Sequence, residues 1–163
     1  MDLKEKLQKL NIIEHAEFDL RGGDKTKIYF DVKKAFGNTA LINFIATELY
    51  KLFDKSVTCI AASGYGGIPI AVVISDRYNL PLVLVRQKDK DHGIKKRIEG
   101  YIPNKNDNVA VVDDVFTKGT SLISTIEVLK EFTNIEGCYV VIKRTDNNFR
   151  YKLVSLFQHK EFI

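Results

Sequence analysis

The sequence predicts an α/β fold in which a parallel sheet is flanked by helices. After residue 57, short apolar runs of strand length alternate with segments whose apolar residues recur at helical spacing. These runs are apolar at almost every position, which is typical of parallel strands that are buried on both faces. The chain of 163 residues also has the length of one domain, and it can bury a core without disulfide or metal support.

The first third of the chain is predicted to contain two helices and a short strand. Three leucines recur at helical spacing in residues 2–11, which predicts the first helix. A polar, glycine-containing stretch at residues 19–27 then leads into a strand at residues 28–32. The second helix spans residues 38–53, where five Leu and Ile side chains form one apolar stripe.

The rest of the chain repeats a strand–loop–helix order. The predicted strands are residues 57–62, 82–86, 108–112, 137–143 and, at the edge of the sheet, 152–157. Between them lie a glycine-rich loop at residues 63–67, a helix at 68–78, a charged stretch at 87–100 and a second helix at 122–132. Ligands of parallel sheets bind at the carboxyl ends of the strands, so we expect functional residues directly after the core strands.

Composition and charge narrow the function classes. The net charge of +4 suits an anionic substrate but is too small to indicate nucleic-acid binding by itself. There is no run of about 18 apolar residues and no apolar signal segment, so we expect a cytoplasmic protein without a membrane or nucleic-acid partner. Cys59 and Cys138 sit in apolar strand-like runs and are expected to be buried thiols without a redox or metal role.

Residues 108–121, NVAVVDDVFTKGTS, carry the clearest chemical pattern. An apolar strand delivers Asp113 and Asp114 to its end, where two carboxylates can bind a vicinal diol or attract a cation. The next loop brings hydroxyl groups and Gly119 to the start of a helix, whose backbone N–H groups favour a phosphate. A sugar phosphate would then be held at both ends. The alternative is a strand end with solvated acids, followed by an ordinary helix cap.

This element resembles the phosphoribosyl pyrophosphate motif of the type I phosphoribosyltransferases. The resemblance extends over nearly the whole chain and points to the orotate phosphoribosyltransferase family. It implies one domain over residues 1–163, with a small hood mainly at residues 1–35 and a core at residues 36–163. The implied contacts of phosphoribosyl pyrophosphate are Gly66, Gly67, Arg86, Lys88, Asp113, Asp114, Val115, Phe116, Thr117, Lys118, Gly119, Thr120 and Ser121.

Two further segments resemble the parts of the family that surround the base. Residues 18–31 are similar to the hood that covers the orotate ring, and residues 141–146 to the strand end whose arginine pairs with the orotate carboxylate. The orotate contacts that this resemblance implies are Arg21, Tyr29, Phe30, Thr117 and Arg144. Without the resemblance, Tyr29 and Phe30 would rather indicate the core of a strand.

Two others resemble loops of the family, each with a departure. Residues 63–70 are similar to the pyrophosphate loop, but Gly66 stands where some members have a lysine. Residues 86–100 resemble the mobile catalytic loop, although Gln87 replaces a lysine for which Lys88 offers a substitute. The residues that match this loop are Arg86, Lys90, His92 and Gly93.

The implied reaction transfers ribose 5-phosphate from phosphoribosyl pyrophosphate to N1 of orotate, giving orotidine 5'-monophosphate and pyrophosphate in pyrimidine biosynthesis. The implied catalytic residues are Lys90, His92, Asp113 and Asp114. Mg²⁺ is the expected cofactor, held mainly by substrate and water near the two aspartates rather than by a cage of side chains. Because the family's loop reaches into the neighbouring active site, the resemblance implies a homodimer with shared sites.

Two alternatives stay open at this stage. The motif reads only the ribose phosphate, so a type I transferase for another nucleobase fits it equally well. The second alternative is a non-catalytic regulator that binds phosphoribosyl pyrophosphate, because Gly66 and Gln87 stand in place of lysines. The sequence shows neither an added DNA-binding helix pair nor a strong basic patch, which argues against that role.

Overall fold

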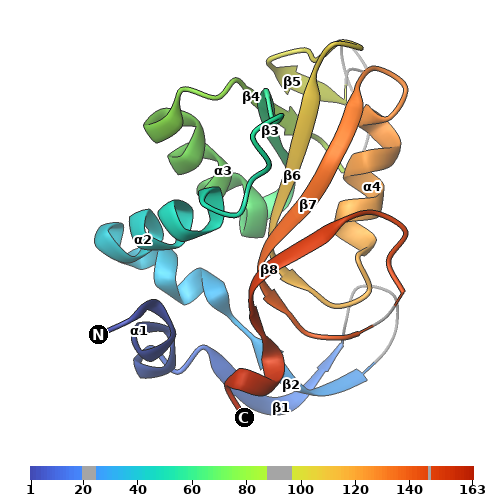
Figure 1. Cartoon of the computed structure of the whole chain (residues 1–163). Helices are drawn as coiled ribbons and strands as arrows, with labels where there is room; N and C mark the ends of the chain where they lie inside the picture. Colours follow the sequence, from blue (N-terminus) through green and yellow to red (C-terminus); the bar gives the residue numbers. More distant parts are fainter. Residues whose placement is uncertain (20–24, 88–96, 147) are drawn as a thin grey trace.

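The computed structural model describes residues 1–19, 25–87, 97–146 and 148–163, whose strands form a large sheet and a small ribbon (Figure 1). In sheet order, the strands of the large sheet are β5 (Ile98–Gly100), β4 (Leu82–Val85), β3 (Cys59–Ala62), β6 (Asn108–Phe116), β7 (Asn134–Lys143) and β8 (Leu153–Gln158). Neighbouring strands are parallel, except that β4 and β5 are antiparallel. The predicted α/β fold with a mainly parallel sheet is confirmed, and β8 is its predicted edge strand.

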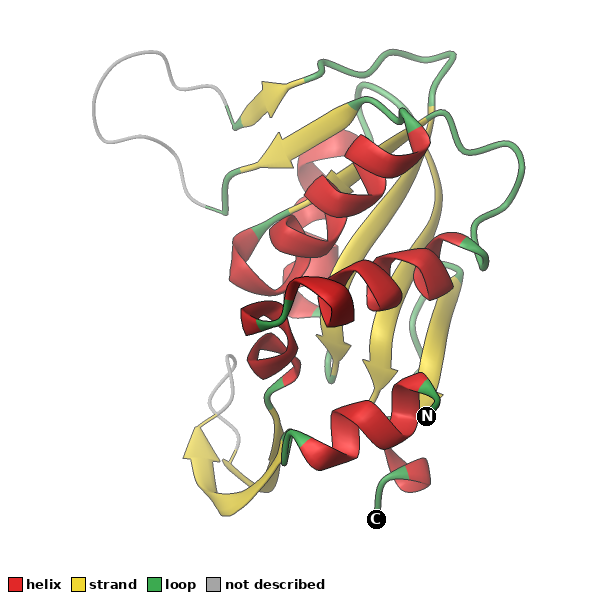
Figure 2. Ribbon diagram, turned by 90° about the vertical axis from the view of Figure 1, so that its left-hand side faces the viewer, coloured by secondary structure: helices red, strands yellow, loops and turns green. Residues whose placement is uncertain are grey.

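Helices cover both faces of this sheet, as predicted. They are α2 (Thr39–Tyr50), α3 (Gly64–Tyr78) and α4 (Thr120–Leu129). The first two lie on one face, which Figure 2 views from their side, and α4 lies on the other (Figure 1). In the part of the chain that the structure describes, no helix combines the length and the apolar character that crossing a membrane requires.

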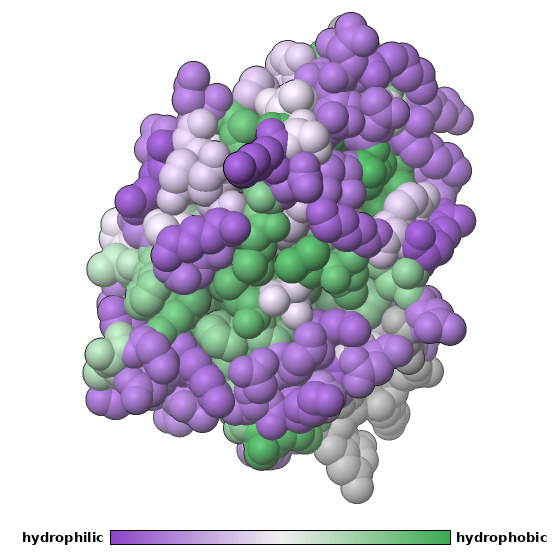
Figure 3. Space-filling view, in the orientation of Figure 1, coloured by the Kyte–Doolittle hydropathy of each residue, from purple (hydrophilic) through white to green (hydrophobic). Residues whose placement is uncertain are grey.

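Strand β6 is central because it contributes to both layers of the core. Ala110 and Val112 belong to the cluster that packs under α2 and α3. Val109 and Val111 point the other way and belong to the cluster under α4. On the face seen in Figure 3, apolar side chains gather in a band across the middle, with hydrophilic side chains above and below it. Buried on both faces, β6 holds its carboxyl end in a fixed place.

The N-terminal residues form a separate layer below the sheet (Figure 1). Its elements are α1 (Leu3–Lys9), the antiparallel ribbon of β1 (Ile13–Asp19) and β2 (Lys25–Phe30), and the 3₁₀ helix η1 (Val32–Gly37). The chain returns to this layer after the short helix η2 (His159–Glu161), where Phe162 packs edge-on against Phe30 with ring centroids 6.1 Å apart. The C-terminus therefore helps to hold the predicted hood against the core.

Several boundaries differ from those predicted. Helix α3 begins at Gly64, so the predicted glycine-rich loop is the first turn of the helix. Strand β6 continues to Phe116 because its last residues pair with β7, so Asp113 and Asp114 lie within the strand rather than after it. Strands β1 and β5 were not predicted, and each is held by antiparallel pairing that the local sequence does not reveal. The strand predicted at residues 28–32 ends at Phe30.

The two thiols lie inside the large sheet. Cys59 on β3 and Cys138 on β7 are fully buried among apolar residues, as predicted. Burial raises the pKa of Cys59 to about 11 and the pKa of Cys138 to about 12, so both thiols stay protonated at neutral pH.

Candidate active site

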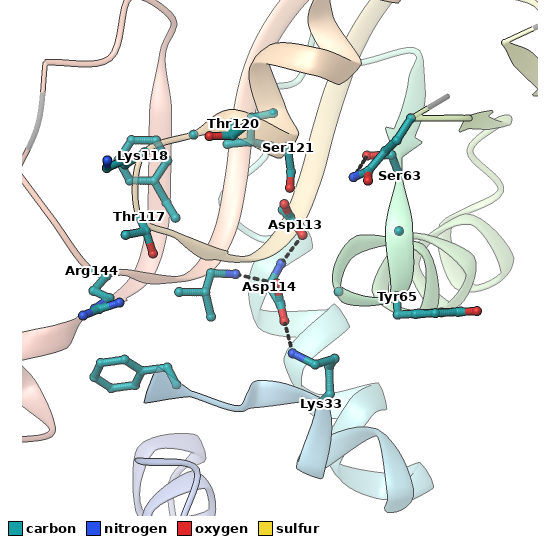
Figure 4. Close-up of a pocket in the computed structure, with 18 of the residues that line it drawn as sticks. Lys33, Ser63, Tyr65, Asp113, Asp114, Thr117, Lys118, Thr120, Ser121 and Arg144 are labelled. Atoms are coloured by element: carbon teal, nitrogen blue, oxygen red, sulfur yellow. Dashed lines mark hydrogen bonds and ion pairs between the residues drawn. The ribbon is translucent and has the colours of Figure 1, made fainter. Parts of the chain in front are cut away.

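A cavity of about 430 Å³ opens at the carboxyl ends of β3 and β6, between the sheet and the hood (Figure 4). The N-terminal layer contributes Tyr29, Phe30 and Lys33 to its wall, and the first turn of α3 contributes residues 63–66. The rest of the wall consists of Gln87, residues 113–122 and Arg144. Residues from distant parts of the sequence therefore face one cavity, at the edge of the sheet where ligands of parallel sheets bind.

The two carboxylates at the end of β6 are oriented by their own backbone. Oδ1 of Asp113 accepts a hydrogen bond from the N–H of Asp114 at 2.9 Å. Oδ1 of Asp114 accepts one from the N–H of Val115 at 2.8 Å. Asp113 is 8 % exposed, and this burial, together with the charge of Asp114, raises the pKa of its carboxyl group. The buried carboxyl group of Asp113 therefore holds its proton more strongly than an exposed aspartate does.

Gly66 allows the first turn of α3 to touch this carboxylate pair. A Cβ atom at position 66 would lie 2.3 Å from Oδ1 of Asp114 and 2.9 Å from Oδ1 of Asp113, so a side chain there would displace the carboxylates. The backbone N–H groups of this turn have no partners within the helix, which favours an anion beside it.

Gly67 is needed for a different contact. A Cβ atom there would lie 2.3 Å from the backbone oxygen of Val112, so only glycine lets α3 pack this closely on β6. Gly67 is buried in this contact and does not line the cavity, so its position does not support the predicted contact with a ligand.

The loop between β6 and α4 is shaped to receive an anion. Gly119 has φ +76°, a left-handed conformation that residues other than glycine adopt only with strain. Gly119 is the N-cap of α4, and as a glycine it has no side chain that could cap the first turn of this helix. The N–H groups of that turn and the side chains of Thr117, Thr120 and Ser121 line the cavity together (Figure 4).

The segment between β7 and β8 supports this loop from outside. The N–H of Arg144 donates to the backbone oxygen of Phe116 at 2.8 Å, and the hydroxyl of Thr145 donates to the backbone oxygen of Thr117. The ring of Phe149 contacts that of Phe116 edge-on, with centroids 5.1 Å apart. A Cβ atom on Gly119 would lie 2.7–2.8 Å from atoms of these two rings, so the loop is closely packed.

The opposite end of the cavity lies against the hood. Arg144 follows β7 and lies beside Thr117 (Figure 4), and its burial lowers the pKa of the guanidinium group from its usual high value. Tyr29 lines the cavity from β2. Phe30 reaches the wall but is only 2 % exposed, because its ring packs against Phe162 in the core. Both aromatic residues predicted to contact orotate therefore line the cavity, but only Tyr29 carries a polar group, its hydroxyl.

Lys33 is a cavity residue that the sequence analysis missed. Its ammonium group donates a hydrogen bond to the hydroxyl of Tyr29 at 3.0 Å and another to Oδ2 of Asp114 at 3.3 Å. It also lies 3.3 Å from Oδ1 of Asp31. The available signal was its position four residues after Tyr29, but the strand predicted over residues 28–32 hid the turn that brings the two side chains together.

The two described residues that follow β4, Arg86 and Gln87, have different surroundings. Gln87 lines the cavity, and its amide lies 3.5 Å from the hydroxyl of Ser63. Arg86, predicted to contact a phosphate, instead forms two contacts of 3.0 and 3.1 Å with the carboxylate of Glu99 and does not line the cavity. Its partner belongs to β5, which was not predicted. The predicted residues Arg21, Lys88, Lys90 and His92 lie outside the described residues.

No group of three or more His, Cys, Asp or Glu side chains that could hold a metal ion occurs within the described residues. The carboxylate pair at positions 113 and 114 still offers the hard oxygen ligands that Mg²⁺ prefers, and this ion is often bound by one or two carboxylates together with substrate phosphates.

Comparison with known proteins gives consistent matches. The model of the family described as "Phosphoribosyl transferase domain" matches residues 33–155. An orotate phosphoribosyltransferase of Methanocaldococcus jannaschii is 32% identical over 151 residues, which cover 90% of this chain and 85% of that protein. An orotate phosphoribosyltransferase of Pyrococcus horikoshii is 35% identical over 158 residues, which cover 90% of this chain and 82% of that protein.

Solved structures match the fold. The crystal structure of orotate phosphoribosyltransferase from Aeropyrum pernix superposes with a TM-score of 0.83 at 24% identity, covering 99% of this chain and 96% of that one. An adenine phosphoribosyltransferase from Thermoanaerobacter pseudethanolicus also matches, with a TM-score of 0.70 at 16% identity over 95% of this chain and 99% of that one. The fold is thus shared by proteins named for different bases.

Proposed function

Because the chain belongs to the phosphoribosyltransferase family and has orotate phosphoribosyltransferases among its relatives, we propose that it transfers ribose 5-phosphate from phosphoribosyl pyrophosphate to orotate. The products are orotidine 5'-monophosphate and pyrophosphate, in pyrimidine biosynthesis. The observation that carries this proposal is the carboxylate pair on β6, followed within a few residues by Gly119, an N-cap without a side chain, and the first turn of α4. The proposal treats residues 1–163 as one catalytic domain that works in the cytoplasm.

The cavity suggests how each part of the substrates is held. The first turn of α4 binds the 5-phosphate, and Asp113 and Asp114 accept hydrogen bonds from the ribose hydroxyls. The first turn of α3 faces the pyrophosphate with its N–H groups. Arg144 pairs with the orotate carboxylate, since a guanidinium group matches a carboxylate with two parallel hydrogen bonds. These contacts place N1 of orotate near C1 of the ribose.

The chemical difficulty of this reaction is electrostatic. As the bond between C1 and the pyrophosphate oxygen breaks, positive charge develops on the ribose and negative charge on the leaving group. The acidic pair beside the ribose stabilises the positive charge, and the N–H groups of α3 beside the leaving group stabilise the negative charge. Removing a contact of this kind from a developing charge costs about 10²–10³ in rate. Lys88, Lys90 and His92 are proposed to add positive charge near the leaving group.

Mg²⁺ is part of the proposal, since Asp113 and Asp114 offer the oxygen ligands that it prefers and the diphosphate substrate would supply others. When bound, it would neutralise part of the charge on the leaving pyrophosphate. Activity should therefore disappear with EDTA and return with added Mg²⁺.

A homodimer with shared active sites is also proposed. Tyr65, 89% exposed, and Val72, 45% exposed, lie on α3 and are candidate contacts with the second copy. The test mixes an Asp114→Asn protein with a Lys90→Ala protein. If the loop serves the neighbouring site, mixed dimers contain one intact site and regain activity, whereas no recovery would argue against sharing.

The main test follows the loss of orotate absorbance with phosphoribosyl pyrophosphate and Mg²⁺. Loss that is abolished by Asp113→Asn with Asp114→Asn would establish the reaction and its sugar-phosphate site. Competition with other nucleobases tests the base, because the fold itself is shared with an adenine phosphoribosyltransferase. If orotate is not consumed while another base is, the family assignment holds and the base assignment fails.

A further inference from the structure

The ammonium group of Lys33 lies where the N-terminal layer meets the end of β6. Lys33 belongs to η1, whereas Asp114 belongs to the central strand of the large sheet. Figure 4 shows the lysine extended from the N-terminal layer toward Asp114, on the other side of the cavity from Arg144. The contact of 3.3 Å between Lys33 and Asp114 is thus a polar bridge between two layers that are far apart in the sequence.

Three oxygen atoms surround this ammonium group. They belong to the hydroxyl of Tyr29, at 3.0 Å, and to the carboxylates of Asp31 and Asp114, both at 3.3 Å. The ammonium also lies 5.4 Å from the centre of the Tyr29 ring. Oδ1 of Asp31 is buried and has no hydrogen-bond partner among the described residues, so the ion pair with Lys33 compensates its charge. Removing the lysine would take from both carboxylates the cation with which they pair among the described residues.

The electrostatic setting keeps this lysine charged. Burial alone would lower the pKa of Lys33, but the hydrogen bond with Tyr29 and the charge of Asp114 outweigh it and raise the pKa. Although the Lys33 side chain is 36% exposed, its ammonium group has a hydroxyl and two carboxylates as partners, so it links the two layers instead of extending into solvent.

We propose that Lys33 is a positioning residue of the transfer reaction, which holds Asp114 toward the ribose and Tyr29 over the base position at the same time. This inference rests on the proposed function, in which Asp114 binds the ribose hydroxyls and the hood covers the base. A single ammonium group then fixes the distance between the two substrates. Its loss should weaken binding of phosphoribosyl pyrophosphate, although Lys33 itself comes from the layer that covers the base.

Lys34 provides a matched control beside it. Its ammonium lies 2.7 Å from Oε1 of Glu14 and donates to the backbone oxygen of Asn11 at 2.9 Å. It has the same charge, comes from the same 3₁₀ helix and does not line the cavity. Lys34→Met therefore reports what the loss of one lysine does to the N-terminal layer alone.

The experiment compares Lys33→Met, Lys33→Arg and Lys34→Met in steady-state kinetics with both substrates. We expect Lys33→Met to raise KM for phosphoribosyl pyrophosphate and to lower kcat, with a combined loss of about 10²-fold in kcat/KM, as for misplacement of a reacting group by about 1 Å. Lys33→Arg keeps the charge and should recover most of this loss. Lys34→Met should stay within about 2-fold of the unmodified protein. A Lys33→Met protein whose melting temperature falls while its KM for phosphoribosyl pyrophosphate is unchanged would show a purely structural role and overturn the proposal.

A double-mutant cycle tests whether Lys33 acts through Asp114. The dissociation constant of phosphoribosyl pyrophosphate is measured by calorimetry for Lys33→Met, Asp114→Asn and the double variant. If the lysine works by orienting Asp114, its removal should matter little once Asp114→Asn is present. Fully additive losses would contradict the mechanism. Because calorimetry needs no turnover, an unmodified protein that binds this ligand but does not consume orotate would refute the proposed function and leave the Lys33 result readable.

Discussion

The two ends of the cavity are built in different ways. At the phosphate end, the binding groups follow one another along the chain, from the carboxylates of β6 through Gly119 into α4. At the base end, the groups come from the N-terminal layer and from the end of β7, and Lys33 bridges the N-terminal layer to β6. The phosphate end is therefore held by one continuous stretch of sequence, whereas the base end is held by contacts between segments that are distant in the sequence. Damage at either end should therefore affect one substrate more than the other.

The largest effect is expected from Gly119→Ala, at the phosphate end. The left-handed backbone disfavours alanine by about 1–2 kcal/mol, and the new Cβ would lie 2.7 Å from the ring of Phe116 and 2.8 Å from that of Phe149. The loop must shift, and we expect kcat/KM for phosphoribosyl pyrophosphate to fall by about 10²-fold. Gly37→Ala is the control, because a Cβ there meets nothing within 4 Å. An equal loss of orotate affinity in direct binding would mean that the two ends are not separable.

At the base end, Arg144→Met should raise KM for orotate by about 10–100-fold. The estimate follows from the loss of a hydrogen bond to a charged group, which contributes about 1.5–3 kcal/mol. KM for phosphoribosyl pyrophosphate should change little, because the backbone N–H of Arg144 still supports the phosphate loop at Phe116. Arg150→Met is the control, since that arginine pairs with Glu127 on the surface. If Arg144→Met weakened phosphoribosyl pyrophosphate binding as strongly as orotate binding, the two ends of the cavity would not act separately.

A smaller effect is expected from Phe149→Ala, which removes support from outside the phosphate loop. An aromatic pair of this kind contributes about 0.5–1.5 kcal/mol, so KM for phosphoribosyl pyrophosphate should rise by roughly 2–10-fold. Orotate binding should be unchanged. Phe132→Ala serves as the control, because Phe132 is 47% exposed and lies in the turn after α4. No change in either KM would show that the loop keeps its shape without the ring.

The smallest effect concerns stability, at the carboxylate pair between the two ends. Burial and the charge of Asp114 make the pKa of Asp113 higher in the folded protein than in the unfolded chain. Its contribution to stability is therefore complete below the unfolded pKa, about 4, and is lost as the pH rises through the folded pKa. Asp113→Asn removes this loss, so the variant should gain stability relative to the unmodified protein progressively as the pH rises from about 4 to about 8. Denaturant unfolding without Mg²⁺ or substrate measures it, and parallel pH profiles would contradict it.

The same comparison explains what the sequence could predict. At the phosphate end, neighbours in space are neighbours in the chain, so residues 113–121 were recognised together. Lys33 lies 81 positions from Asp114 and was missed, because nothing local indicates that pairing. Arg86 was placed at the phosphate by its motif, but the unpredicted strand β5 supplies Glu99 as its partner.

The start of α3 was misplaced for a related reason. Glycines weaken isolated helices, so Gly64, Gly66 and Gly67 suggested a loop. Close packing on β6 overrides that preference, since a Cβ at Gly67 would collide with the backbone of Val112. In both cases, the outcome depended on a partner strand that the local sequence does not specify.

The burial of Cys59 and Cys138 has a practical consequence for labelling. They are the only two cysteines of the chain, and with pKa values of about 11 and 12 they hold almost no thiolate at neutral pH. Maleimide and other alkylating reagents attack the thiolate, so the folded protein should react very slowly with them. A cysteine placed at an exposed position such as Ile102 would then be modified selectively. Fluorescent or spin probes can thus be attached one at a time, without first replacing the native thiols.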